Sequence, residues 1–145
     1  MKRYIHNLHD RAMLVKFIQQ QDKPMTVTIE KGIIGKRSIE QNRLQRLWLS
    51  ELAEQGDMTA EEYRGYCKLH FGVPIMRNAN AEFKQGYDRL VKDRFDYGFK
   101  LELMMMPFDF PVTRLMTLKQ KQQYLDAIFH FFTSKGFKLA EMGDE

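Results

Sequence analysis

The 145-residue sequence has one cysteine, Cys67, so the chain cannot form an internal disulfide. Small secreted domains without disulfides are unusual, which favours the reducing cytoplasm as the location. No apolar run approaches the roughly 18 residues that a membrane-spanning helix needs. The first residues, MKRYIHNLHDR, lack the apolar core of a signal peptide. We therefore expect a cytoplasmic protein without membrane association.

Glycine and proline are sparse, at nine and four residues, and they do not gather into a linker or a low-complexity segment. There is also no glycine-rich loop of the Walker type for nucleotide phosphates. A chain of this length has the size of one domain. The sequence thus predicts a single domain over residues 1–145.

The net charge of +4 and the sequence pI near 9.2 mildly favour polyanionic partners. The distribution of charge is more informative than its sum. Positive side chains concentrate in residues 36–46 and 84–94, whereas the tail LAEMGDE is acidic. We expect nucleic acid, if it binds, to contact the two basic segments.

Three segments open with Ser or Thr followed three residues later by Gln or Glu. This spacing is typical of a capping box, in which the hydroxyl accepts from a backbone amide and the later side chain reaches back. Gly136 suits the residue that follows the last helix. The pairs Ser38/Gln41, Thr59/Glu62 and Thr117/Gln120 therefore predict helices over about 38–54, 59–70 and 117–134.

Apolar spacings of three and four predict two further helices, over about 8–18 and 83–91. The segment MTVTIEKGII alternates β-branched and polar residues, which predicts a strand with a turn or second short strand after it. A second strand is predicted over 99–106, stopped by Pro107. The expected fold is α+β and predominantly helical: an N-terminal helix and a short β-hairpin or small sheet, followed by a bundle of about four helices.

The stretch GKRSIEQNRLQRLW combines cations, amides and an indole around a helix start. At about 100° per residue, we expect one apolar face with Leu44, Leu47, Trp48 and Leu52, and an opposite face with Arg43, Arg46 and Ser50. Lys36 and Arg37 precede the predicted cap, where unpaired backbone amides attract anions. These charged residues are equally compatible with a phosphate-binding surface and with an ordinary solvated helix face. Trp48 is compatible with packing in the core or with stacking on bases.

The string KRSIEQNRLQRLWLSELA, preceded by TVTIEKG, resembles the NinB/Orf family of bacteriophage recombination proteins. The later segments TAEEYRGYCKLHFGVPI and LMTLKQKQQYLDAIFHFFTSKGFKL are similar to that family's middle and C-terminal helices. The resemblance covers most of the chain from about Met25 onward. It implies a dimer in a bacterial host cell that binds single-stranded DNA and loads recombinase onto strands covered by single-strand-binding protein, without known catalysis.

From the residues and the resemblance together, we predict a non-catalytic recombination mediator that binds single-stranded DNA with little sequence preference. Single-strand-binding protein and recombinase are further expected partners. Arginine and lysine side chains would contact phosphates, and the amides would contact backbone or bases. The predicted DNA-binding residues are Lys36, Arg37, Gln41, Asn42, Arg43 and Arg46, with Lys92 and Arg94 on the second basic segment and Trp48 as a candidate for base stacking.

Two alternative functions stay open at the level of sequence. A base-flipping or branched-DNA-binding protein without catalysis would need an exposed wedge, for which Trp48 or Tyr97 is a candidate. A metal-dependent, structure-specific nuclease would need converging carboxylates. Asp109, between two phenylalanines and two prolines, is either a turn former or a perturbed functional group. The other candidate carboxylates are Glu61, Glu62, Asp88, Asp93 and Asp96, but they form no recognisable motif.

Neither a catalytic residue, a metal site nor a cofactor is predicted. His6 and His9 are three residues apart, but no second pair of ligands follows them with the spacing of a zinc site. The segment YLDAIFHFF is apolar over a wide arc of its helix, which is typical of burial in a large core or against a partner. We expect a homodimer whose interface includes this helix.

Overall fold

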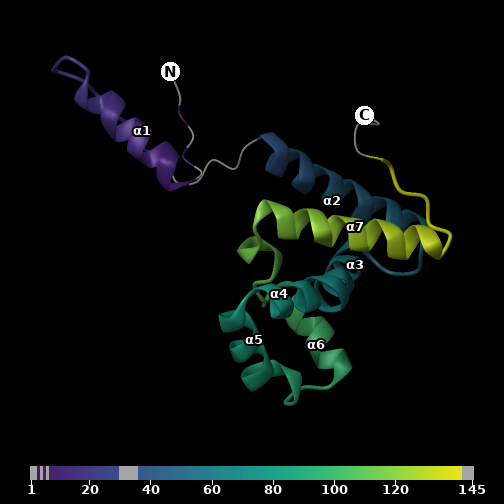
Figure 1. Ribbon diagram of the computed structural model, residues 1–145. Helices are drawn as coiled ribbons and strands as arrows, with labels where there is room; N and C mark the ends of the chain where they lie inside the picture. The colour runs from purple at the N-terminus through teal and green to yellow at the C-terminus, as the bar shows by residue number, and fades with distance from the viewer. Residues whose placement is uncertain (1–2, 4, 6, 30–35, 142–145) are drawn as a thin grey trace. The chain divides into compact units, whose positions relative to one another are not determined.

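Every regular element is a helix in the residues that this computed structural model describes, which are 3, 5, 7–29 and 36–141 (Figure 1). The predicted α+β fold with a hairpin or small sheet was therefore wrong. Residues 25–29 of the first predicted strand have no regular structure, and residues 30–34 lie outside the described part. An alternating sequence becomes a strand when a partner pairs with its backbone groups, and no such partner exists among the described residues.

The second predicted strand, over 99–106, is instead the helix α6 (Tyr97–Met104). Asp96 provides its N-cap, because its carboxylate accepts a hydrogen bond from the backbone amide of Phe99 at 2.8 Å. Alternation over four residues is too short to distinguish a strand from a helix. The cap and the burial of Met104 decide the outcome.

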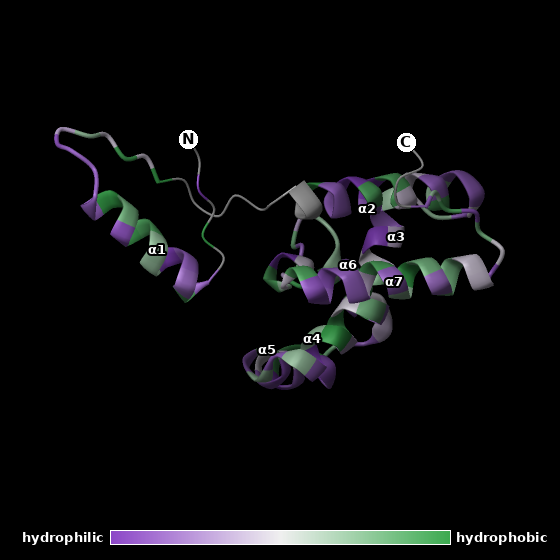
Figure 2. Cartoon of the chain, turned by 45° about the horizontal axis from the view of Figure 1, so that its top comes forward, coloured by the Kyte–Doolittle hydropathy of each residue, from purple (hydrophilic) through white to green (hydrophobic). Residues whose placement is uncertain are grey.

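The chain divides into two units, Met1–Ile39 and Glu40–Glu145. In the first, α1 (Leu8–Gln19) begins at Asn7, whose side chain accepts from the amide of Asp10 at 2.8 Å. The predicted N-terminal helix is thus confirmed. Figure 2 shows hydrophobic and hydrophilic residues along α1, yet none of its residues is buried.

The three helices predicted from capping boxes are all present. Both hydroxyl caps predicted at Thr59 and Thr117 are confirmed, with the reciprocal bonds of the capping box. Ser38 lies inside its helix, which begins two residues earlier than predicted. The bounds are α2 (Lys36–Gln55), α3 (Ala60–Cys67) and α7 (Leu118–Ser134).

Helix α7 ends as its sequence predicts. Gly136 has φ of 95°, in the left-handed region that favours glycine. The backbone amide of Gly136 donates to the carbonyl oxygen of Thr133 at 3.1 Å, and that of Phe137 donates to the carbonyl oxygen of Phe132 at 3.0 Å. These two bonds form a Schellman motif. The motif turns the chain back toward α2.

The middle of the chain consists of short helices joined by wider π-helical turns. After α3, the turn η1 (Lys68–Gly72) leads into α4 (Val73–Ala79), whose first turn contains a proline. The helix predicted over 83–91 is confirmed as α5 (Ala81–Tyr87) and the turn η2 (Asp88–Lys92). A 3₁₀ turn, η3 (Thr113–Leu115), precedes α7.

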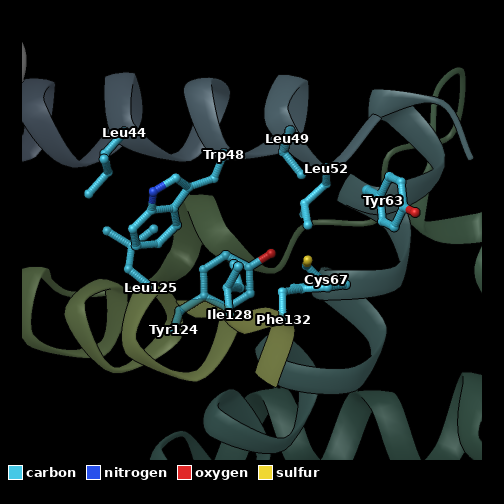
Figure 3. Close-up of a cluster of buried hydrophobic side chains, with 10 residues drawn as sticks. All are labelled: Leu44, Trp48, Leu49, Leu52, Tyr63, Cys67, Tyr124, Leu125, Ile128 and Phe132. Carbon is cyan, nitrogen blue, oxygen red and sulfur yellow. The ribbon is translucent and has the colours of Figure 1, made fainter. Parts of the chain in front are cut away.

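The larger of two apolar clusters joins α2, α3 and α7 (Figure 3). Trp48 is 5% exposed, and its indole nitrogen donates to the carbonyl oxygen of Ala140 at 2.6 Å. The core-packing interpretation of Trp48 is therefore confirmed. The buried members of this cluster are Leu44, Trp48, Leu49, Leu52, Tyr63, Cys67, Tyr124, Leu125, Ile128 and Phe132.

A smaller cluster lies beneath α4, α5 and α6. Gly72, at the junction of η1 and α4, passes so close to Val112 that an added Cβ would lie 2.7 Å from its Cγ1. The buried members are Val73, Met76, Tyr87, Val91, Met104 and Val112. Within the described residues, no helix combines the length and apolar character needed to cross a lipid bilayer.

Replacing Leu52 by Ala should lower the free energy of unfolding by about 2–5 kcal/mol, because the side chain is fully buried between α2 and α7 and would leave a cavity. Chemical denaturation followed by circular dichroism measures this loss. Leu47→Ala is the matched control, since Leu47 lies on the same helix and is 42% exposed. Equal effects of the two substitutions would contradict the assignment of this core.

Candidate nucleic-acid interface

The rotation of α2 separates its arginines from its apolar side chains. Leu44 and Trp48 are buried in the larger cluster, whereas Arg43 and Arg46 are exposed. Helical spacing predicts this arrangement for these four residues, but it was wrong for Leu47, which is 42% exposed. The two arginines lie on the outer face, one turn apart. We call Arg43, Arg46 and the exposed Ser50 the α2 face.

The two amides of the motif lie differently from the arginines. Gln41 is completely buried, and its Nε2 donates to the carbonyl oxygen of Leu118 at 3.4 Å and to Oε1 of Gln122 at 3.2 Å. Its amide therefore connects α2 to the first turns of α7, and Gln41 does not belong to the α2 face. Asn42 is half-buried.

The indole of Trp48 is likewise unavailable for base stacking, because it is enclosed by the core. Its ring lies 5.5 Å from that of Phe129, centroid to centroid. The predicted contacts Lys36 and Arg37 and the cap residue Ser38 have side chains outside the described residues.

The second predicted basic segment is exposed but does not extend the α2 face. Lys92 ends η2, and Arg94 follows it two residues later. Helix α5, which leads into this segment, lies at the opposite end of the Glu40–Glu145 unit from α2 in both views (Figures 1 and 2). Among the predicted DNA-binding residues that the structure shows exposed, Arg43 and Arg46 therefore lie on a different surface from Lys92 and Arg94.

A buried lysine in η1 joins this turn to the end of α6 and the segment that follows it. Lys68 is 2% exposed, and its ammonium group donates to Oδ1 of Asp109 at 2.6 Å and to the carbonyl oxygen of Met104 at 2.8 Å. Arg64, one turn earlier, lies 2.9 Å from the same carboxylate oxygen and binds Glu61 through two nitrogens, at 2.7 and 2.8 Å. These contacts attach α3 and η1 to the chain that follows α6.

The pKa values of these groups follow from their surroundings. Hydrogen bonding from Lys68, and then from Arg64, holds the pKa of Asp109 below its usual value, although partial burial opposes this. Burial lowers the pKa of Lys68, and the bond to Asp109 opposes that shift. Asp109 also has φ of 48°, in the left-handed region. The interpretation of Asp109 as a turn former is confirmed, and its lowered pKa comes from the ion pairs with Lys68 and Arg64.

Sequence reasoning missed Arg64 and Lys68. The available signal was their spacing of four, which places them on one side of a helix, together with Glu61 three residues before Arg64. The signal did not identify the partner, because Asp109 is 41 residues away from Lys68 in the sequence. Their role is to hold the fold together, since the ammonium group is enclosed.

The carboxylates considered for a nuclease are distributed over separate structural roles. Asp88 binds Arg77 at 2.7 and 3.0 Å, and Glu62 closes the capping box with Thr59. Asp96 caps α6. In the part of the chain that the structure describes, no three His, Cys, Asp or Glu side chains gather as a metal-binding group.

Comparisons of this chain with protein-family models, with curated proteins and with solved structures found no match. The chemistry that the α2 face itself offers is the binding of anions. Guanidinium groups donate forked hydrogen bonds to phosphate oxygens and stack on the flat faces of bases. Two such groups one helical turn apart are suited to a flexible polyanion.

Asp109→Asn should lower the free energy of unfolding by about 1–3 kcal/mol, because it leaves the buried ammonium of Lys68 without its anionic partner. Asn tolerates the left-handed backbone at this position, so the effect reports the charge. Urea unfolding at neutral pH measures it. Asp93→Asn, at an exposed position, is the control. Unchanged stability in Asp109→Asn would show that the ion pair contributes nothing.

The stability of the folded chain should also depend on pH through Asp109. Its pKa is lower in the folded chain than the ordinary 3.8, so at intermediate pH the unfolded chain binds more protons. The contribution should be complete above about pH 5 and disappear as the pH falls through the lowered pKa. Between pH 7 and 3, the original chain should lose more stability than Asp109→Asn. Parallel losses in urea titrations would contradict this assignment.

Proposed function

We propose that this protein binds single-stranded DNA through the α2 face, without catalysis and with little sequence preference. The observation that supports the proposal is the exposure of Arg43 and Arg46 on the side of α2 opposite its buried residues. The core holds the helix in this rotation, so Arg43 and Arg46 lie on the exposed side of α2 in the folded chain. Phosphate contacts of this kind carry no sequence information.

The choice of single strands over duplex comes from two arguments. One is the resemblance of residues 36–43 to the NinB/Orf motif. The other is geometric: successive arginines one turn apart are separated by roughly 4.5 Å along the helix axis, which allows them to follow a flexible backbone or to stack on unpaired bases. Lys36 and Arg37 remain proposed contacts at the start of α2. Gln41 and Trp48 are withdrawn, because both are buried.

The proposed biological role is that of a recombination mediator in a bacterial host cell. It rests on the resemblance, which also supplies single-strand-binding protein, recombinase and a second copy of the chain as proposed partners. The wide apolar arc of α7, predicted as part of a homodimer interface, contributes Tyr124, Leu125 and Ile128 to the chain's own core. A homodimer would therefore need apolar surface from other elements.

Replacing Arg43 and Arg46 together by Ala should weaken binding to a single-stranded oligonucleotide and reduce its salt dependence. Each phosphate contact adds roughly −0.7 to the slope of log affinity against log salt, so the loss of both arginines should make the slope shallower by roughly 1.4. Fluorescence anisotropy at several salt concentrations measures the slope. The double variant Arg114→Ala/Lys138→Ala is the control, since it removes the same charge from exposed positions outside α2.

An Arg43→Ala/Arg46→Ala variant with the original slope and affinity would return the α2 face to an ordinary solvated surface. The substitutions lie on the exposed side of the helix, so the thermal unfolding midpoint should stay near that of the original chain. A flat salt response of the original chain would contradict phosphate binding altogether.

A further inference from the structure

Three aromatic side chains are exposed at the start of α6. Phe95 is 36% exposed, and Tyr97 and Phe99 are each 52% exposed. The rings of Phe95 and Phe99 stack on each other, with centroids 4.8 Å apart and planes inclined by 15°. Exposed aromatic rings are unfavourable in water, and contiguous apolar patches at a protein surface often bind a ligand or another molecule.

Tyr97 is held in place by a second aromatic group. Its hydroxyl lies 2.7 Å from Nε2 of His70, and the imidazole of His70 stacks on the ring of Tyr66 at 4.1 Å. Partial burial lowers the pKa of His70, which favours the neutral ring, and a neutral imidazole can share a hydrogen bond with the tyrosine hydroxyl in either tautomer. Tyr97 lies about 200° around α6 from Phe99, so it contacts η1 on another side of the helix and does not belong to the stacked pair.

The charged residues next to these rings in the sequence have a small positive excess. The acids include Asp96, which is engaged as the cap of α6, and the ammonium of Lys100 donates to the carbonyl oxygen of Lys92 at 2.6 Å. The exposed cations nearest in sequence are Lys92 and Arg94, directly before Phe95. The cations of residues 89–102 are Arg89, Lys92, Arg94 and Lys100, and the acids are Asp93, Asp96 and Glu102.

We propose that the stacked pair Phe95 and Phe99 forms a platform on which unpaired bases of single-stranded nucleic acid stack, with Lys92 and Arg94 contacting the adjoining phosphates. This aromatic platform rests on the proposed function, since it names a second contact region for the same ligand. Aromatic side chains accept any base, because every base has a π face. The platform supplies the stacking role that the buried Trp48 does not fill.

A second copy of the chain is a weaker candidate for the occupant. Two copies meeting symmetrically at this surface would bring the same patch against itself, and with it the exposed cations Lys92 and Arg94 of both copies. Like charges brought together oppose association. A nucleic acid strand instead offers bases to the rings and phosphates to the cations.

The test compares an oligothymidylate with an abasic strand of the same length, using anisotropy at two salt concentrations. The main variant is Phe95→Ala/Phe99→Ala, and Phe99→Trp keeps a stacking ring. Phe108→Ala is the matched control, because Phe108 is an exposed phenylalanine beyond the end of α6. Thermal unfolding verifies that each variant is folded.

We expect Phe95→Ala/Phe99→Ala to bind oligothymidylate roughly 5- to 150-fold more weakly for each stack lost, with the salt slope unchanged. Its affinity for the abasic strand should equal that of the original chain. Phe99→Trp and Phe108→Ala should bind oligothymidylate like the original chain. This pattern separates stacking from the phosphate contacts of the α2 face.

Retention of oligothymidylate affinity in Phe95→Ala/Phe99→Ala would overturn the platform while leaving the proposed function intact. An equal loss toward the abasic strand would also overturn it, as would a shift from dimer to monomer in sedimentation with DNA affinity unchanged. If the original chain binds neither strand, the proposed function fails, and the platform fails with it.

Discussion

The burial of Trp48 against α7 is the contact on which the presentation of the α2 face depends. Its indole packs in the larger cluster and donates to the carbonyl oxygen of Ala140, so the end of the chain is attached to α2. Gln55 adds to this attachment through its amide, which bonds in both directions with the backbone of Lys138. A helix held at several points cannot turn about its axis, and the arginines opposite the core are therefore fixed toward solvent.

In the middle of the chain, a buried ion pair holds two segments together. Lys68 reaches from η1 to Asp109 and the end of α6, and Arg64 and Glu61 continue the contact on α3. Removing an ammonium from water is costly, and a carboxylate with a nearby carbonyl offsets that cost only when the geometry is good. Such a pair specifies one arrangement of the two segments, whereas apolar contacts would tolerate several.

The sequence predicted what local interactions determine. Thr59 and Thr117 start helices because the bonds of a capping box connect residues three apart, and Gly136 ends one because its backbone is left-handed. The strands failed because pairing depends on a distant partner, which no local pattern reveals. The candidate site shows the same difference between local and distant interactions. Helical spacing correctly predicted that Arg46 is exposed, but the burial of Gln41 depends on α7, whose Leu118 is 77 residues away in the sequence.

This division affects how the motif is interpreted by mutagenesis. Gln41 and Trp48 flank Arg43 and Arg46 in the same short stretch, yet their side chains lie on the opposite, buried side of α2. A substitution of Trp48 would remove the packing and the hydrogen bond that hold the helix in position. It would therefore weaken the proposed DNA binding without removing a contact to DNA. Loss of binding alone therefore does not identify a contact within this motif. The discriminating quantity is the salt slope, because it counts phosphates and is insensitive to a uniform loss of folded protein.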